Sequence, residues 1–175
     1  MRWRPASDAG LLGDNVIVWD QGVARFNFRV AGVAIRDGQV LLHRGERDSY
    51  WSLPGGRAEL LESTEETLRR EMLEELGIAA RVERLLWVVE NFFTLDARKY
   101  HELSLYFLMT LPPEVGGGET RFYGEELEPR FIYEWHPLDG LGELALPLKP
   151  SFLYDGLPSL PEVPAHLVHR DEAQA

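Results

Sequence analysis

The sequence predicts a layered α/β fold. Several segments have the alternating or continuous apolar pattern of β-strands, and they lie both before and after one segment with the period of an amphipathic helix. Strands and helices that are mixed in this order are typical of layered α/β domains. The length of 175 residues is sufficient for one domain with a core, and no repeat or linker is visible, so we expect a single domain over residues 1–175.

The composition narrows the classes of protein to which the chain can belong. It contains no Cys, which excludes disulfides and Cys-ligated metal sites and fits the reducing cytoplasm, where we expect it. No apolar run approaches the ~18 residues of a membrane span, and no signal peptide is recognisable, so we expect no membrane partner. The formal net charge of −11 disfavours binding to polymeric nucleic acid, although a small phosphorylated ligand can still bind beside a metal ion.

The first half of the chain contains three expected strands. Residues 1–14 have no periodicity and are expected to form a loose N-terminal arm. In the longest of the three strands, polar and apolar residues alternate at first, and residues 30–35 are then almost entirely apolar, as in a strand deep inside a sheet. Asp37-Gly38 is a typical hairpin turn. The expected strands span residues 15–19, 23–35 and 39–43.

One amphipathic helix follows these strands. Ser63 and Glu66 have the spacing of a capping box, so the helix is expected to begin at about residue 64. Gly77 stands where a left-handed C-terminal cap belongs. Apolar residues recur every four positions between these ends and predict the face that docks onto the sheet. This apolar stripe consists of Leu68, Met72 and Leu76.

The second half of the chain contains further strands and two expected loops. Residues 92–100 are rich in aromatic and charged side chains, and residues 112–128 contain a Pro pair and three consecutive Gly, so both segments are predicted to be loops. A short helix is expected within residues 150–157. The expected strands span residues 81–91, 102–111, 130–135 and 166–170, the last of them at a sheet edge.

Three carboxylates fall on one side of the expected helix, next to its apolar stripe. At about 100° per residue, Glu71, Glu74 and Glu75 lie within an arc of roughly 100°. Their charges repel one another at neutral pH. A divalent cation such as Mg²⁺ or Mn²⁺ would offset this repulsion, because such ions prefer oxygen ligands. The alternative is a solvated acidic face that binds nothing.

The whole stretch from Gly56 to Ile78 resembles the Nudix box, written G-x5-E-x7-R-E-U-x-E-E-x-G-U with U an aliphatic residue. Leu61 is a departure, because many relatives carry Gly at this position. The resemblance implies a mixed β-sheet sandwiched between helices, with the box as a loop, helix and loop at the mouth of the site. The specified positions are filled by Gly56, Glu62, Arg70, Glu71, Met72, Glu74, Glu75, Gly77 and Ile78.

The resemblance implies a divalent-metal-dependent pyrophosphohydrolase. Relatives cleave a nucleoside diphosphate linked to another group, so the expected substrate is a nucleoside triphosphate or a related small nucleotide, and the expected cofactor is Mg²⁺ or Mn²⁺. Arg70 is expected to orient Glu side chains rather than to touch substrate. Glu71 is a third ligand or the general base. The implied metal ligands are the Gly55 carbonyl, Glu71, Glu74 and Glu75.

Relatives often take a further Glu from a late loop, as a base or as an additional ligand. We take Glu126 as the catalytic candidate, although its neighbours Glu125 and Glu128 are equally compatible with the pattern. Glu102 and Glu90 are less expected. For each of these residues the alternative is an ordinary surface Glu.

Arg44 and Gly56 are the expected contacts to the substrate. Arg44 directly follows a strand that is expected to approach the box, and its guanidinium could hold a phosphate; the alternative is a solvated Arg, as is more expected for Arg47. A different function also remains open, because some Nudix folds are non-catalytic nucleotide-binding or sensor modules. Those modules usually have broken boxes, whereas this box is intact.

Overall fold

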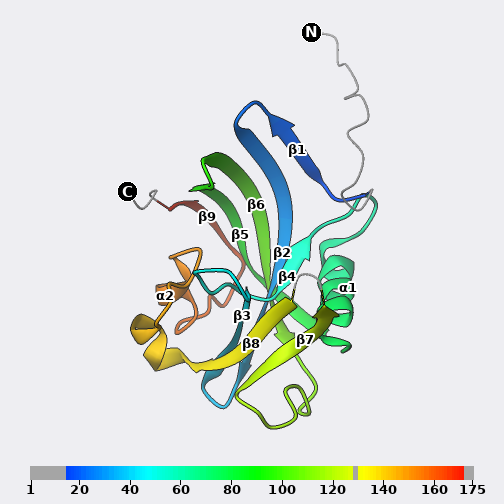
Figure 1. Cartoon of the computed structure of the whole chain (residues 1–175), viewed down its shortest axis with the longest axis vertical. Helices are drawn as coiled ribbons and strands as arrows, with labels where there is room; N and C mark the ends of the chain where they lie inside the picture. Colours follow the sequence, from blue (N-terminus) through cyan, green and yellow to red (C-terminus); the bar gives the residue numbers. More distant parts are fainter. Residues whose placement is uncertain (1–14, 128–129, 172–175) are drawn as a thin grey trace.

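The computed structural model describes residues 15–127 and 130–171, and the expected arm of residues 1–14 lies outside this part of the chain. The described residues form one nine-stranded sheet with helices on its two faces (Figure 1). The helices are α1 (Thr64–Leu76), the 3-10 helix η1 (Leu138–Glu143) and α2 (Leu153–Gly156). The strands are β1 (Val18–Gln21), β2 (Ala24–Arg36), β3 (Gln39–Gly45), β4 (Gly55–Arg57), β5 (Arg81–Leu95), β6 (Arg98–Thr110), β7 (Arg121–Leu127), β8 (Arg130–Pro137) and β9 (Ala165–Arg170).

Strand β2 organises the sheet because it has neighbours along both edges. Along one edge it pairs successively with β1, β4 and β3, all antiparallel. Along the other edge it runs parallel to β6 from Ala24 to Ala34. The strand order is β7-β8-β3-β2-β6-β5-β9, with β1 and β4 beside β2, and β5 with β9 is a second parallel pair. The sheet is therefore mixed, and it brings distant segments to the centre of the molecule.

Two apolar layers, one on each face of the sheet, hold the helices in place. Adjacent strand residues face opposite ways, so Val30 joins the layer of α1 and Ala31 joins the layer of α2. Leu68 and Met72 of α1 are inaccessible to solvent in the first layer, and Leu153 of α2 is inaccessible in the second. The structure is the expected α/β (α+β) arrangement, a mixed sheet between helices (Figure 1).

Several sequence expectations are confirmed at the level of single elements. The Asp37-Gly38 turn joins β2 to β3, and both residues have positive φ. Strand β9 lies at one end of the sheet, as expected, and α2 falls within residues 150–157. Among the described residues, no helix is long and apolar enough to cross a membrane.

The expectation of a loop at residues 92–100 is wrong. Strand β5 continues to Leu95, and β6 already begins at Arg98, so only Asp96 and Ala97 form the turn. Both have positive φ, 49° and 63°, which is the geometry of a two-residue hairpin turn. Such turns usually contain Gly. Because this turn has Ala97 instead, the sequence did not indicate a hairpin here.

The loop expected at residues 112–128 is also too long. Residues 121–127 form β7, which pairs with β8 through a register shift between Tyr123 and Leu127. The irregular pairing hides the strand pattern, because a bulge breaks the strict alternation of side chains. The remaining connection between β6 and β7 contains three consecutive Gly with positive φ, Gly116, Gly117 and Gly118.

Replacing Ala97 by Gly should stabilise the protein. A left-handed conformation costs a residue with a Cβ about 1 kcal/mol, so we expect the free energy of unfolding to rise by up to about 1 kcal/mol in urea titrations. Ala79→Gly is the control, because the φ of Ala79 is not positive and the added chain freedom there can only destabilise. Equal effects of the two substitutions would contradict a left-handed turn at Ala97.

Candidate active site

The box forms both of the expected helix ends. Ser63 Oγ accepts the N–H of Glu66 at 3.3 Å, and the Glu66 carboxylate accepts the N–H of Ser63 at 2.8 Å. Gly77 has a φ of 65° and caps the C-terminus of α1. Leu61, which stands in the place of a Gly in many relatives, adopts a left-handed φ of 69° with a fully exposed side chain. The tight turn before the helix therefore forms without Gly.

Gly55 and Gly56 allow the box to lie against strand β2 and helix α1. A Cβ at Gly55, where φ is +135°, would lie 2.2 Å from the carbonyl oxygen of Val30. A Cβ at Gly56 would lie 2.2 Å from the carboxylate of Glu71. These distances are far below van der Waals contact, so any side chain here would displace the strand or the carboxylate. The Glu71 carboxylate thus lies directly against the backbone of β4.

Arg70 connects several parts of the box through its guanidinium. Its Nε and Nη2 donate to Glu62 at 2.9 and 3.1 Å, and Nη2 also donates to the Arg57 carbonyl at 3.0 Å. Its Nη1 donates to Glu71 at 2.8 Å and to Glu74 at 3.0 Å. Hydrogen bonding to Arg70 also lowers the pKa of Glu62. Arg70 is thus placed to orient the acidic side chains around it.

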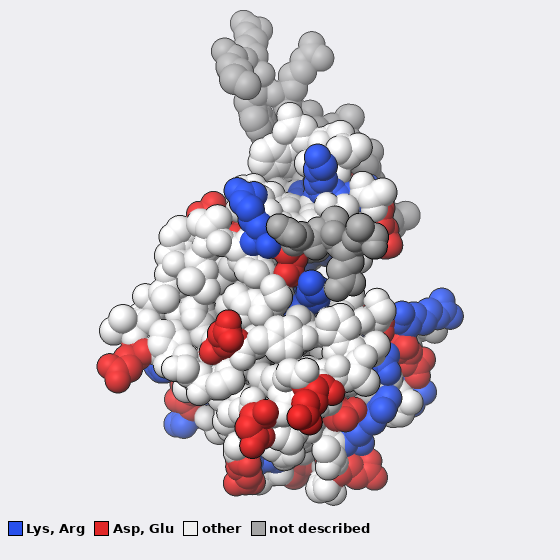
Figure 2. All heavy atoms as spheres, turned by 90° about the vertical axis from the view of Figure 1, so that its left-hand side faces the viewer, with Lys and Arg blue, Asp and Glu red and all other residues white. Residues whose placement is uncertain are grey.

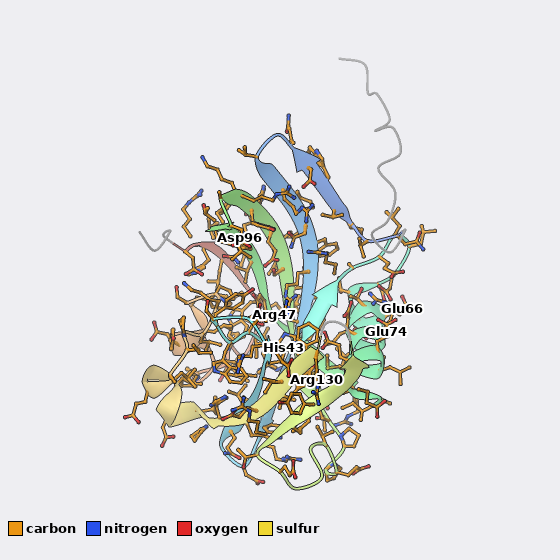
Figure 3. All side chains as sticks on the ribbon, in the orientation of Figure 1. His43, Arg47, Glu66, Glu74, Asp96 and Arg130 are labelled. Carbon is orange, nitrogen blue, oxygen red and sulfur yellow. The ribbon has the colours of Figure 1, made fainter. Side chains whose placement is uncertain are left out.

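The three Glu of α1 lie in different environments. Glu74 is exposed on the flank of the helix and pairs with Arg70 (Figure 3). Glu71 is largely buried, and this burial raises its pKa although Arg70 opposes the rise. Glu75 is only 5% exposed, and its carboxylate accepts a hydrogen bond from the Tyr133 hydroxyl at 2.5 Å. Glu71 and Glu75 therefore face the interior, while the metal-binding role of Glu74 stays a prediction.

His43 lies beside Glu75, toward the middle of the molecule (Figure 3). Its Nδ1 is 3.7 Å from Glu75 Oε2, which is too long for a hydrogen bond. Burial lowers the pKa of His43 to about 3, so the ring is neutral at pH 7 and the contact is not an ion pair. The ring stacks on Phe131 with a centroid distance of 5.0 Å.

Two adjoining cavities open beside the box. The smaller, of about 400 Å³, is lined by Gly55, Gly56, Glu71 and Glu75 among other residues. The larger, of about 770 Å³, extends from the box toward residues 147–150 and Asp171. Because they share part of their lining, we describe them together as the cleft. The shared residues are Arg29, Tyr50, Gly55, Phe93, Leu95, Glu102 and Phe131.

Polar side chains of β2 and β6 line the cleft; sequence reasoning ranked Glu102 of β6 below other Glu candidates and did not select Asn27 or Arg29 of β2. Glu102 is 7% exposed and accepts hydrogen bonds from Asn27 Nδ2 at 2.5 Å and from Ser104 Oγ at 2.8 Å. Arg29 lines both cavities and donates to the Leu53 carbonyl at 3.1 Å. The sequence contained one signal for these residues. Polar and apolar residues alternate in β2, and the polar positions include Asn27 and Arg29, which line the cleft.

Of the further Glu candidates whose side chains are described, Glu102 alone lines the cleft. Glu125 is exposed, and its carboxylate lies so close to Gly77 that a Cβ there would be 2.5 Å away. Glu90 contacts His166 at 2.9 Å on the surface. Two candidates lie outside the described side chains, namely Glu126 and Glu128.

The Arg44 side chain donates hydrogen bonds to the backbone of the loop that directly follows it. Its Nη1 donates to the carbonyl oxygens of Gly45 and Glu46 at 3.1 and 3.0 Å, and its guanidinium lies 5.2 Å from the centroid of the Trp51 ring. Arg44 lines neither cavity, whereas Arg29 lines both. The contact of Arg44 with substrate therefore stays a prediction, and Arg29 is the Arg that the fold places beside the box.

Charged side chains of the described residues form neither a complete metal cage nor a continuous basic patch on the face shown in Figure 2. Within residues 15–127 and 130–171, no group of three or more His, Asp or Glu side chains is arranged to hold a metal ion by itself. Figure 2 shows the face that carries α2, where separated acidic side chains are visible and the described residues form no continuous basic patch.

Comparison with known proteins decides the family. The sequence model of the NUDIX domain matches residues 26–156. This chain belongs to the Nudix family. Among proteins of similar sequence, the putative mutator protein MutT4 of Mycobacterium tuberculosis is 33% identical over 145 residues, which cover 74% of this chain and 56% of that protein. The putative ADP-ribose pyrophosphatase YjhB of Bacillus subtilis is 34% identical over 92 residues, or 52% of this chain and 43% of that protein.

The Nudix fold is also present in similar solved structures. The crystal structure of a MutT NUDIX hydrolase from Burkholderia pseudomallei has 31% sequence identity and a TM-score of 0.53, and the match covers 72% of this chain and 92% of that one. By contrast, the chain spans only about half the length of the two curated relatives above.

Substituting Arg70 should destabilise this Nudix box more than substituting its neighbour. Arg70→Leu leaves the largely buried carboxylates of Glu62 and Glu71 without their guanidinium, so we expect a loss of about 2 kcal/mol in the free energy of unfolding. Arg69 makes one exposed pair with Glu65, and Arg69→Leu should cost about 0.5 kcal/mol or less. Equal losses in chemical denaturation would show that the Arg70 network contributes nothing specific.

Proposed function

We propose that this Nudix protein is a divalent-metal-dependent pyrophosphohydrolase that cleaves a nucleoside diphosphate linked to another group, such as a nucleoside triphosphate. The observation that carries the proposal is the lining of the smaller cavity, where Glu71 and Glu75 lie with Gly55 and Gly56. This cavity adjoins a larger one of about 770 Å³, a volume suited to a nucleotide-sized ligand. The similarity to the putative ADP-ribose pyrophosphatase YjhB of Bacillus subtilis supports the same reaction class.

The residues of the smaller cavity fit Mg²⁺ or Mn²⁺. Two carboxylates, Glu71 and Glu75, and the backbone of Gly55 provide only oxygen ligands, and Mg²⁺ is usually held by one or two carboxylates together with substrate phosphates and water. This explains how a metal can bind although the described side chains do not form a complete cage. When bound, the metal would neutralise phosphate charge and acidify a water molecule.

The remaining chemistry falls to side chains of the cleft. In the proposed reaction a water oxygen bonds to one phosphorus, the bridging P–O bond breaks, and its electron pair stays on the departing phosphate. Arg29 lines both cavities and is placed to bind phosphate oxygens. Tyr50, Phe93 and Phe131 lie where the two cavities meet and offer ring surfaces to a base or ribose.

We propose Glu102 as the group that takes the proton of the attacking water. Its two oxygens accept hydrogen bonds from Asn27 and Ser104, and a carboxylate has about four acceptor sites, so capacity remains for a water molecule. Asn27 and Ser104 also hold the carboxylate in one orientation. Glu102 is buried at the boundary of the two cavities, a suitable place for a general base.

The reaction class is tested with a panel of nucleoside triphosphates and nucleoside diphosphate derivatives, with Mg²⁺ or with EDTA. Only with metal do we expect release of phosphate or pyrophosphate from the triphosphates, and of a nucleoside monophosphate and a phosphorylated second product from the diphosphate derivatives. Activity should fall by about a hundredfold or more for Glu71→Gln because a metal-held charge is lost. Glu65→Gln, an exposed residue of the same helix, is the matched control and should retain full activity. Nucleotide binding without any hydrolysis would instead identify a non-catalytic binding module.

The assignment of Glu102 has its own test. Glu102→Gln should lower kcat by about a hundredfold, because the amide cannot accept the proton of the attacking water. Glu90→Gln alters a surface Glu of the adjacent strand and should have no effect. Wild-type kinetics for Glu102→Gln would leave Glu71 or Glu126 as the base.

A further inference from the structure

A buried hydrogen bond joins the helix of the box, α1, to strand β8. Glu75 lies in the last turn of α1, and Tyr133 lies on β8, 58 residues later in the chain. The Tyr133 hydroxyl donates to Glu75 Oε2, and Tyr133 is completely inaccessible to solvent. The Tyr133 hydroxyl thus contacts the Glu75 carboxylate inside the protein core. Glu75 also lines the smaller cavity, whereas Tyr133 does not.

Aromatic neighbours fix the position of the Tyr133 ring. Phe122 of β7 stacks on it with a centroid distance of 5.6 Å and an interplanar angle of 15°. His43 of β3 packs against it at 5.4 Å, and Phe131 stacks on His43 in turn. Residues of three adjacent strands, β7, β8 and β3, therefore surround the ring and hold the hydroxyl in place.

Gly124 of β7 places the same strands directly against the backbone of α1. A Cβ at Gly124 would lie 2.7 Å from the carbonyl oxygen of Glu75 and 3.0 Å from the Tyr133 ring. Both members of the hydrogen bond thus touch one glycine, which leaves no room for a side chain. This contact is independent of the hydroxyl and involves the same pair of residues.

We infer that Tyr133 is a positioning residue for Glu75: it fixes the carboxylate in the orientation that binds the metal, and Gly124 permits the close packing that this requires. The inference rests on the proposed metal site. A hydrogen bond to a ligating carboxylate restricts its rotation, and loss of such an outer partner typically weakens metal binding or activity by 10–100-fold. The alternative is that the contact only stabilises the fold.

The experiment compares Tyr133→Phe with Tyr154→Phe. Tyr154 also uses its hydroxyl in a hydrogen bond, which it accepts from the Leu148 N–H at 2.8 Å, and its substitution controls for the general loss of a hydroxyl. Mn²⁺ binding to nucleotide-free protein is measured by electron paramagnetic resonance. We expect about tenfold weaker binding for Tyr133→Phe and unchanged binding for Tyr154→Phe.

Turnover adds a second readout. Tyr133→Phe should lower kcat with little change in the KM for nucleotide, and raising the metal concentration should restore part of the lost rate. Gly124→Ala retains the hydroxyl but displaces its contacts, so it should also weaken Mn²⁺ binding. Unchanged Mn²⁺ binding in a folded Tyr133→Phe variant, or equal weakening in Tyr154→Phe, would overturn the inference.

The outcomes separate this inference from the proposed function. If the wild type binds Mn²⁺ and Tyr133→Phe weakens that binding, positioning by Tyr133 holds even where no nucleotide in the panel is hydrolysed. If the wild type hydrolyses nucleotides and Tyr133→Phe binds Mn²⁺ normally, the hydrolase proposal stands and positioning by Tyr133 is wrong. If Tyr133→Phe is unfolded, the Mn²⁺ affinity of Gly124→Ala decides, and wild-type affinity there overturns the inference.

Discussion

The guanidinium of Arg70 is the contact on which the geometry of the acidic segment depends. It binds the turn before the helix through Glu62, strand β4 through the Arg57 carbonyl, and the helix through Glu71 and Glu74. One side chain thereby joins three successive pieces of backbone and offsets the repulsion among their carboxylates. Glu71 can then remain largely buried against Gly56.

The local parts of this arrangement could be predicted from the sequence because their causes are local. The capping box, the left-handed Gly77 and the buried stripe with Leu68 and Met72 each involve residues a few positions apart, and all are present. The contact between Glu75 and Tyr133 could not be predicted in this way. It depends on strand order and register, which bring together residues separated by 58 positions.

The errors have equally definite physical causes. The turn at Asp96-Ala97 adopts a conformation that normally requires Gly, so tertiary pairing of two long strands overrides the preference of the turn residues. Arg29 and Glu102 were undervalued because polar residues in an alternating strand are ordinarily assigned to solvent. Here the polar side of β2 and β6 faces an internal cleft, and only the closure of other segments over the sheet makes that visible.

The composition of the two cavities has an evolutionary consequence. Two of the three Glu that line the smaller cavity, Glu71 and Glu75, come from helix α1, whereas the larger cavity draws on β3, β5, β6, β8 and the segment around Pro150. Under the proposed function, drift at positions that line the larger cavity alone can reshape the chamber for the substrate while Glu71 and Glu75 stay in place. Proteins that descend from a common ancestor with this fold can therefore differ in substrate while they keep the same proposed reaction.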